Sequence, residues 1–329
     1  MKSTPRSAGT PVPEIDLTIL IPLYNEEESL QELGDWLTRV IAPMGVSYEL
    51  LWIDDGSTDG SWSLLEEMAG QDSHIRAVRF ARNYGKSPGL QVGFQKARGR
   101  VVITMDADLQ DSPDEVPELY RMIVEEGYDL VSGWKKKRYD PLSKTLPTKL
   151  FNATVRRFSG LKLHDFNSGI KSYDYRVVKS LEVYNDMHRF LPYMAKLAGY
   201  TRIGEKVVVH RARPYGKSKF GMSRFVNGYL DLLVLWFMAR YGKKPMHIFG
   251  FLGSLMFLIG FLALLGIIIY KFVCLSAGVP ARLITDLPYF YLSILGVILG
   301  TQLFLTGFIG ELIARSAGNR NHYNIRDEI

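Results

Sequence analysis

The chain has 329 residues and a net charge of +6, and most of its uninterrupted apolar sequence lies after position 245. This distribution predicts a polar domain followed by a membrane-embedded part, and the absence of a continuous basic stripe argues against a nucleic-acid-binding protein. The single cysteine, Cys274, excludes an intrachain disulfide framework, so the sequence gives no sign of an oxidising compartment.

Residues 1–14 are rich in Pro, Ser and Thr and lack an apolar core, so we expect a disordered tail and not a signal peptide. From Asp16 to about Tyr139 strands and helices alternate. The expected strands are 17–22, 48–53, 75–80, 101–105 and 129–132, and the expected helices are 26–41, 61–69, 87–97 and 113–126. This order predicts an α/β domain whose mostly parallel sheet has helices on both faces.

Polar residues follow four of these strands at the point where each strand ends. They are Tyr24-Asn25-Glu26, Asp54-Asp55, the run from Arg82 to Lys86, and Asp106-Ala107-Asp108. Because ligands of open α/β sheets bind at the carboxyl ends of the strands, we expect these residues to line one crevice.

The stretch from Val101 to Asp111, VVITMDADLQD, runs from a buried strand straight into acids. Asp106 and Asp108 are two residues apart, so on an extended backbone both carboxylates would point to the same side. Gln110 adds a neutral oxygen. Such a set suits Mg²⁺ or Mn²⁺ with open positions for phosphate oxygens. The alternative is an acidic turn that caps the helix after Pro113.

The segments IPLYNEEESL, WIDDGSTDG, ARNYGKSPGL and MDADLQDSP, in this order, resemble the family 2 glycosyltransferases with a GT-A (Rossmann-like) fold. Among them, DADLQ is similar to the polyprenyl-phosphate glycosyltransferases, which include dolichol-phosphate mannose synthases and undecaprenyl-phosphate sugar transferases. The resemblance covers roughly residues 16–220 by motif. It implies an inverting transferase that moves a sugar from a nucleotide-diphosphate sugar to a polyprenyl phosphate.

The resemblance also implies roles for individual positions. It places the metal and the diphosphate, and hence the catalytic centre, at Asp106, Asp108 and Gln110. It places the nucleotide sugar beside Pro22, Tyr24, Glu26, Asp54, Asp55, Ser57, Asn83 and Lys86. Carboxylates suit this task because they accept hydrogen bonds from ribose hydroxyls and base N–H groups. The alternatives are that Asp54 only caps a helix and that Asn83 only belongs to a turn.

The segment 164–174, HDFNSGIKSYD, resembles the family's D-x-x-S-G-F-R motif on the acceptor side. Lys171 replaces the usual Arg, which keeps the charge but loses bidentate geometry. After an expected strand at 207–209 comes a loop similar to the family's G-x-S-K-Y loop. A phosphate acceptor is already a nucleophile near neutral pH and needs only cations to hold it. The candidate cations are Lys171, Arg211, Arg213, Lys217 and Lys219.

The C-terminal part contains two apolar stretches, 246–270 and 287–313, preceded by an amphipathic segment at 221–245. At ~1.5 Å per residue each stretch can cross a hydrocarbon core of ~30 Å. Lys and Arg flank the outer ends of the pair, so the positive-inside rule puts both termini and the catalytic domain in the cytoplasm. We therefore expect a multi-pass protein of the inner (cytoplasmic) membrane. Its expected parts are a GT-A domain at 15–220, a juxtamembrane helix at 221–245, two transmembrane helices within 246–315 and a cytoplasmic tail at 316–329.

Two other functions remain open. A sugar-hydroxyl acceptor, as in cellulose or chitin synthases, would go with a Q-x-x-R-W motif, of which Asn185 to Phe190 is only a faint echo. A non-catalytic nucleotide-sugar-binding membrane scaffold would not need Asp106 and Asp108.

The basic run from Lys135 to Arg138 is expected to be solvated surface. The sequence leaves open the sugar, the nucleotide, Mg²⁺ against Mn²⁺ and whether the chain forms a homo-oligomer.

Overall fold

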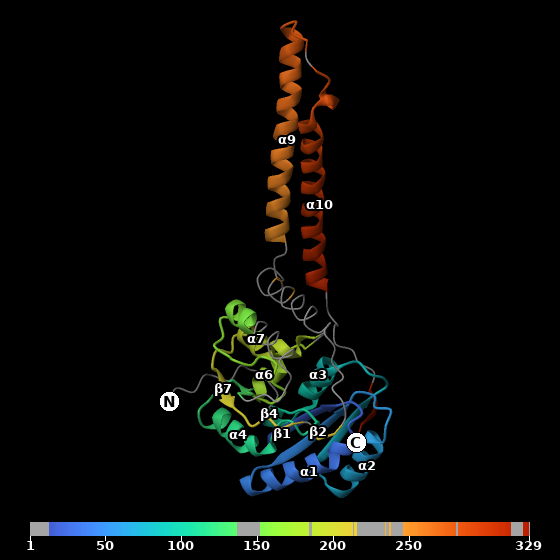
Figure 1. Ribbon diagram of the computed structural model, residues 1–329, viewed down its shortest axis with the longest axis vertical. Helices are drawn as coiled ribbons and strands as arrows, with labels where there is room; N and C mark the ends of the chain where they lie inside the picture. Colours follow the sequence, from blue (N-terminus) through green and yellow to red (C-terminus); the bar gives the residue numbers. More distant parts are fainter. Residues whose placement is uncertain are drawn as a thin grey trace. The chain divides into compact units, whose positions relative to one another are not determined.

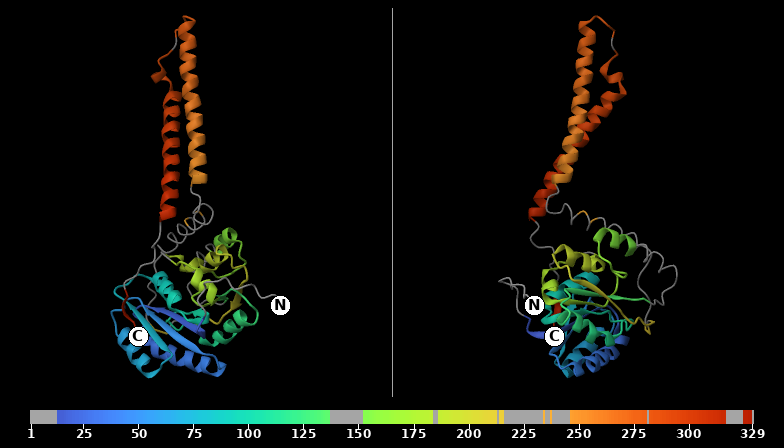
Figure 2. Two further views of the ribbon diagram at one scale, coloured as in Figure 1. Left: turned by 180° about the vertical axis from the view of Figure 1, so that it is seen from behind. Right: turned by 90° about the vertical axis from the view of Figure 1, so that its left-hand side faces the viewer.

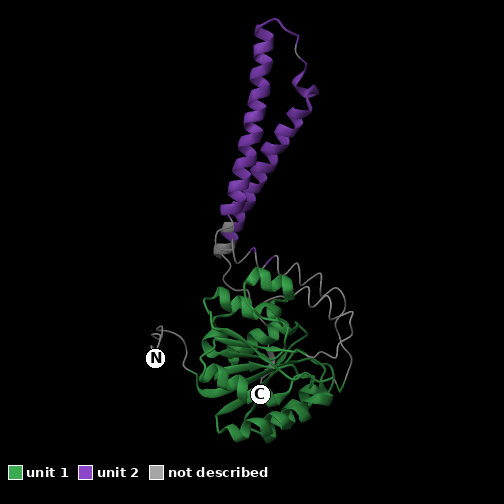
Figure 3. Cartoon of the chain, turned by 60° about the vertical axis from the view of Figure 1, so that its left-hand side comes forward, with its two compact units in different colours: residues 1–232, 321–329 green, residues 233–320 purple. Residues whose placement is uncertain are grey.

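The computed structural model of the chain describes residues 13–136, 152–183, 186–212, 214, 215, 234, 237, 246–280, 282–316 and 325–328. The chain divides into two compact units (Figure 3). The first unit comprises residues 1–232 together with 321–329, and the second comprises residues 233–320.

One mixed sheet forms the centre of the first unit. In the described residues it has eight strands in the order β7-β5-β6-β4-β1-β2-β3-β8. Their bounds are β1 (Ile15–Leu23), β2 (Tyr48–Asp54), β3 (Ile75–Phe80), β4 (Gly99–Thr104), β5 (Leu130–Trp134), β6 (Lys171–Asp174), β7 (Ile203–Val207) and β8 (Ile325–Glu328). Only β6 and β8 run antiparallel to their neighbours, which confirms the predicted mostly parallel sheet.

Helices cover both faces of this sheet (Figure 1). On one face lie α1 (Glu27–Ile41), α2 (Ser61–Gln71) and α4 (Val116–Val124), and on the other lie α3 (Lys86–Lys96), α6 (Tyr175–Ser180) and α7 (Leu191–Leu197). Side chains alternate along β1: Leu17, Ile19 and Ile21 pack towards the first group, and Leu20 packs towards the second. The sheet is therefore buried on both sides, as its continuous apolar strands require.

Three segments differ from the sequence-based prediction. The segment around residue 171 contributes strand β6, which lies between β4 and β5 and runs antiparallel to both. The strand expected at 207–209 is β7, which ends at Val207 and pairs with β5. In the segment expected to be a C-terminal tail, β8 pairs with the edge strand β3. The strands β6 and β8 have only four residues each, too few for a periodic pattern to identify them.

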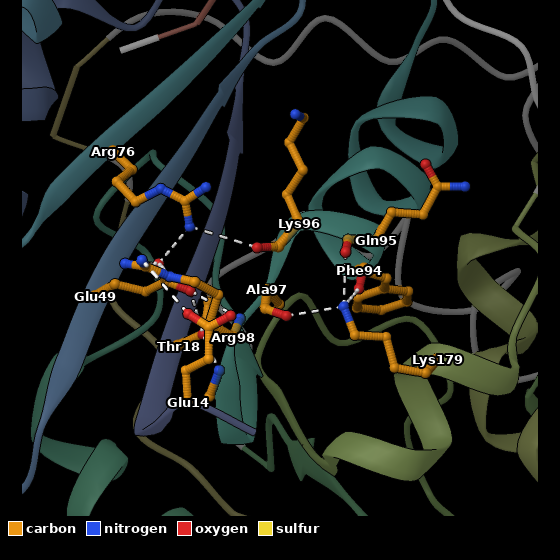
Figure 4. A network of polar contacts seen from close by, with 11 residues as sticks. Glu14, Thr18, Glu49, Arg76, Phe94, Gln95, Lys96, Ala97, Arg98 and Lys179 are labelled. Carbon is orange, nitrogen blue, oxygen red and sulfur yellow. Dashed lines mark hydrogen bonds and ion pairs between the residues drawn. The ribbon is translucent and has the colours of Figure 1, made fainter. Parts of the chain in front are cut away.

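A buried carboxylate joins four neighbouring segments at the amino ends of the parallel strands (Figure 4). Glu49 of β2 is 1% exposed and accepts hydrogen bonds from the Thr18 hydroxyl at 2.7 Å and from Arg76 Nη1 at 2.6 Å. Arg98, just before β4, donates to it from its main-chain N–H and from Nε, both at 2.9 Å. Burial alone would raise the pKa of Glu49, but these bonds hold it below its ordinary value.

Beside this network, Lys179 of α6 fixes the carboxyl end of α3. Its ammonium donates to the main-chain carbonyls of Phe94, Gln95 and Ala97 at 2.7 to 2.8 Å (Figure 4). These carbonyls lack intrahelical partners, so a cation there satisfies them and suits the helix dipole.

The second unit is a helical hairpin. Its helices, α9 (Met246–Ser276) and α10 (Pro288–Ser316), run side by side (Figure 2). Glycines allow this close approach: a Cβ added at Gly253 would lie 2.6 Å from the Gly300 carbonyl oxygen, and one at Gly260 would lie 2.7 Å from the Ser293 carbonyl oxygen. Large apolar side chains along both helices are exposed, unlike those of a core helix in a soluble protein.

Both helices are long and apolar enough to cross a membrane, which agrees with the predicted pair of spans. The juxtamembrane helix expected at 221–245 lies outside the described residues, apart from positions 234 and 237.

The Glu49 network predicts a stability effect. Glu49→Gln should lower the free energy of unfolding by about 2 kcal/mol at pH 7, because two guanidinium groups lose their buried partner. The loss should be measured by denaturant unfolding of the purified full chain in detergent. Since the folded-state pKa of Glu49 is lowered, its stabilisation is present above the ordinary value of 4.5 and is lost at lower pH. The variant and the wild type should therefore converge in acid.

The matched control is Glu118→Gln on α4, which breaks an exposed pair with Arg121 at 2.7 Å. It should change stability by less than about 0.5 kcal/mol. An equal effect of the two substitutions would show that the Glu49 network does not join the strands as described.

Candidate active site

The loops after β1 and β2 are fastened to each other by Asp54, Ser57 and Asn25. Asp54 is fully buried, and its Oδ1 accepts a hydrogen bond from the Ser57 main-chain N–H at 2.8 Å. The Ser57 hydroxyl in turn accepts one from the Asn25 main-chain N–H at 2.9 Å. Burial raises the pKa of Asp54, although Ser57 and the nearby Arg79 oppose this shift. These three residues therefore join the two loops at the carboxyl edge of the sheet.

Asp55 holds the turn that follows β3. Its two carboxylate oxygens accept hydrogen bonds from the main-chain N–H groups of Tyr84, at 2.7 Å, and Gly85, at 2.8 Å. Asp55 is only 6% exposed, and burial raises its pKa to about 6 despite these two bonds. The same carboxylate therefore orders the turn from which α3 begins.

The DADLQ segment forms a turn and not an extended strand. β4 ends at Thr104, and Leu109 has a left-handed backbone with φ of 58°. A non-glycine residue pays about 1 kcal/mol for this conformation, and the buried Leu109 side chain packs into the core that holds it there. Ala107 and Asp108 lie in a turn, so the extended backbone expected for Asp106 and Asp108 is not found. Instead, Asp108 Oδ1 accepts a hydrogen bond from the Gln110 main-chain N–H at 3.2 Å.

Asp106 is bound by the ammonium group of Lys86, the first residue of α3. The Asp106 side chain remains 30% exposed. Burial alone would raise its pKa, but Lys86, Lys135 and Lys171 together hold the pKa below its ordinary value. On its other side the carboxylate touches Gly169, where an added Cβ would overlap Asp106 Oδ2. The glycine of the acceptor-side motif therefore allows this close approach to Asp106.

Lys135 lies at the site, whereas the sequence predicts that the basic run from Lys135 to Arg138 is solvated surface. Its side chain is only 12% exposed, and its ammonium lies 2.6 Å from Asp111 Oδ1. Burial would lower the pKa of Lys135, but Asp111 and Asp106 raise it above its ordinary value. Asp111 Oδ2 is buried and has no hydrogen-bond partner in the described part of the chain. In the sequence, the only signal for Asp111 as a site residue is its position directly after DADLQ.

Lys171 reaches the site through strand β6. In the sheet it pairs with Thr104, the last residue of β4, and with Ser132 of β5. Its side chain is almost fully buried, and its ammonium donates to the Ser168 carbonyl oxygen. Burial lowers the pKa of Lys171 to about 8, while Asp165 and Asp106 oppose the shift. Lys171 is thus a buried cation, held in place near Asp106.

The structure describes only one of the other predicted acceptor residues, Arg211. Arg211 is tied to the DADLQ turn by its main-chain N–H, which donates to the Gln110 carbonyl oxygen at 2.8 Å. Its guanidinium, however, lies over the ring of Trp36 at 4.2 Å. The remaining members of the predicted set lie outside the described residues; they are Arg213, Lys217 and Lys219.

Four predicted nucleotide-side residues lie at the ends of β1 and β3. Pro22, Tyr24 and Glu26 are partly buried, and the Glu26 main-chain N–H donates to the Ser61 hydroxyl at 3.1 Å. Asn83 is exposed in the turn that Asp55 holds. These residues border the same edge of the sheet as the carboxylates.

Comparisons of the sequence with known proteins agree on one family. The model of glycosyl transferase family 2 matches residues 18–182. The chain is 35% identical to the dodecaprenyl-phosphate galacturonate synthase of Rhizobium johnstonii, over 94% of this chain and 91% of that protein. It is 34% identical to the undecaprenyl-phosphate 4-deoxy-4-formamido-L-arabinose transferase of Shewanella sediminis, over 94% of this chain and 92% of that protein.

Solved structures share the fold at lower identity. The chain is similar to the glucosyl-3-phosphoglycerate synthase of Mycobacterium tuberculosis, with a TM-score of 0.52 and 20% identity over 69% of this chain and 81% of that one. A structure of the same protein with Mn²⁺, UDP-glucose and glycerol 3-phosphate gives a TM-score of 0.50, also at 20% identity, over 69% of this chain and 80% of that one. This likeness supports the fold.

The raised pKa of Asp55 predicts a pH dependence of stability. Because the folded state binds this proton more tightly than the unfolded chain, stability should fall as pH rises from the ordinary value of 3.8 to about 6. The contribution should be roughly 2–3 kcal/mol. Asp55→Asn removes the titrating group, so its stability relative to wild type should increase over this window. Parallel pH curves for the two proteins, measured by denaturant unfolding, would contradict the assignment.

Proposed function

The chain belongs to glycosyl transferase family 2, and we propose that it transfers a sugar from a nucleoside-diphosphate donor to a polyprenyl phosphate. The observation that carries this proposal is the extent of the match. Two relatives whose names specify polyprenyl-phosphate products align over more than 90% of both chains, beyond the family model and into the C-terminal hairpin. Neither a soluble sugar transferase nor a nucleotide-binding domain alone would account for an alignment of that length.

The residues at the end of β4 fit a divalent cation. Asp106 and Asp108 offer hard carboxylate oxygens and Gln110 an amide oxygen, and Asp106 already takes a cationic partner in Lys86. No set of three His, Cys, Asp or Glu side chains in the described residues is arranged to hold a metal by itself. Phosphate oxygens of the donor would therefore complete the coordination. Bound there, Mg²⁺ or Mn²⁺ would supply positive charge for the departing diphosphate.

The chain's own residues would bind and orient the donor. In this proposal the base and ribose lie over the floor made by Asp54, Asp55 and Ser57, bordered by the residues at the ends of β1 and β3. These border residues are Pro22, Tyr24, Glu26, Asn83 and Lys86. The hydrogen bonds from main-chain N–H groups hold Asp54 and Asp55 in place before the donor arrives. Such preorganisation reduces the ordering cost of binding.

The acceptor phosphate needs no general base, because it is largely a dianion at neutral pH. The chain would have only to hold it opposite the leaving diphosphate, and displacement from that side inverts the sugar carbon. Lys171 and Arg211 are the described cations of the predicted acceptor set, and Arg213, Lys217 and Lys219 complete it. Lys135, at the same edge of the sheet, adds a buried positive charge.

We further propose that α9 and α10 cross the cytoplasmic membrane and that both termini and the catalytic unit are in the cytoplasm. The support is the basic residues that flank the pair, Arg240, Lys243 and Lys244 before it and Arg315, Arg320 and Arg326 after it. Around the loop between the helices there are only two basic residues, Lys271 near the end of α9 and Arg282 in the loop itself.

The reaction can be tested with the purified chain, a panel of radiolabelled UDP- and GDP-sugars, and undecaprenyl phosphate. One sugar should appear on the lipid phosphate, and excess chelator should stop the transfer. Asp108→Ala should lower kcat at least 100-fold, corresponding to about 3 kcal/mol of lost transition-state stabilisation. Glu118→Gln, on the outer face of α4, serves as the control with full activity. Transfer only to a sugar hydroxyl, or full activity in chelator, would refute this mechanism.

The membrane topology can be tested by labelling single cysteines in whole cells. In a Cys274→Ser background, Val279→Cys in the loop between the helices should react with an impermeant thiol reagent. Glu67→Cys, on an exposed position of α2, should react only after the cells are permeabilised. The reverse pattern would place the catalytic unit outside the cytoplasm.

A further inference from the structure

We propose that Lys86 is a displaceable counter-cation of Asp106. In the donor-free protein its ammonium neutralises the carboxylate, and it leaves when a divalent cation binds together with the donor diphosphate. The inference rests on the proposed function, since it concerns the same carboxylate that would bind the metal. It adds a role for a lysine that the motif alone places only beside the nucleotide sugar.

Three lysines surround Asp106, but they have different direct partners. Lys135 pairs with Asp111, and Lys171 donates to the Ser168 carbonyl oxygen. Lys86 alone among these three has a contact with an Asp106 oxygen in the described structure. That oxygen is a ligand atom of the proposed metal site. A divalent cation and an ammonium group at the same oxygen would repel each other, so one must leave.

The three lysines also differ in their freedom to move. The side chain of Lys86 is 30% exposed, that of Lys135 is 12% exposed, and Lys171 is 2% exposed. Lys86 is also the first residue of α3 and follows Gly85, which has φ of 100°. It therefore extends from a helix end and is the most exposed of the three lysines. Lys135 and Lys171 are held by buried partners and would remain as fixed positive charges.

The diphosphate explains where the released ammonium goes. Asp55 binds the turn immediately before residue 86. A donor that lies over the floor made by Asp54, Asp55 and Ser57 therefore brings its negative charge close to Lys86. The ammonium can then exchange the Asp106 carboxylate for a phosphate oxygen, and the carboxylate becomes available to the cation. Metal and nucleotide should therefore bind with positive coupling, and each should bind weakly alone.

The test is Mn²⁺ binding, followed by the electron paramagnetic resonance signal of free Mn²⁺, with the full chain in detergent. Each protein is titrated without nucleotide, with UDP and with GDP. Lys86→Met should bind Mn²⁺ about tenfold more tightly than wild type without nucleotide, because the competing charge is gone. It should also lose most of the gain in Mn²⁺ affinity that UDP or GDP gives the wild type.

Lys96→Met is the matched control, since it removes the same charge from the last residue of the same helix, at the end away from Asp106. It should behave like the wild type in every titration. Lys86→Arg keeps the charge and can grip the carboxylate with two N–H groups, so it should bind Mn²⁺ more weakly than wild type without nucleotide. This second variant gives an independent result if Lys86→Met does not fold.

The outcomes separate this inference from the proposed function. Equal or weaker Mn²⁺ binding by Lys86→Met without nucleotide, or binding by Lys86→Arg as tight as that of the wild type, would overturn the exchange of Lys86 for the metal. A wild-type chain that bound no Mn²⁺ even with UDP or GDP would refute the metal site itself, and the exchange with it.

Discussion

Negative charge at the carboxyl edge of the sheet is the constraint on which the rest of the site depends. Parallel strands end side by side there, and β2 and β4 run into aspartates that cannot be buried without a partner. Main-chain N–H groups bind one oxygen of Asp54 and both oxygens of Asp55, and so fix the loops after β2 and β3. Lysines pair with Asp106 and with one oxygen of Asp111, and so join α3 and the end of β5 to the DADLQ turn. The carboxylates proposed to bind ligands therefore also order the loops around them.

At the amino edge of the same sheet, a buried carboxylate has different partners and a different degree of burial. Glu49 is paired from three directions by Thr18, Arg76 and Arg98, and it is almost completely covered. Such a network leaves no oxygen for a ligand and serves to hold β1, β2, β3 and the start of β4 together. At the carboxyl edge Asp106 stays partly exposed, and its partner Lys86 is also partly exposed. The same chemical group thus gives stability at one edge and, in our proposal, an exchangeable site at the other, according to burial.

The helical hairpin depends on a different interaction. In a membrane there is no hydrophobic gain from packing two apolar helices together, so close van der Waals contact has to hold them. Gly253 and Gly260 of α9 meet the backbone of α10 near Gly300 and Ser293, where any side chain would collide. The large apolar residues point outwards along both helices. The hairpin is thus built for lipid surroundings, while the glycines give it a defined internal contact.

The sequence by itself determined the alternation of strands and helices from β1 to β5, the DADLQ segment and the two apolar stretches, because each is a local pattern of a few to some thirty residues. It also carried the four motifs that identify the family. Only the tertiary structure decided that β6 lies between β4 and β5, which brings Lys171 to the end of β4. It also decided the partners of Asp106 and Asp111, which are 20 and 24 residues away. Those contacts follow from the order of strands in the sheet, and that order is set by the packing of the whole unit and not by any local pattern.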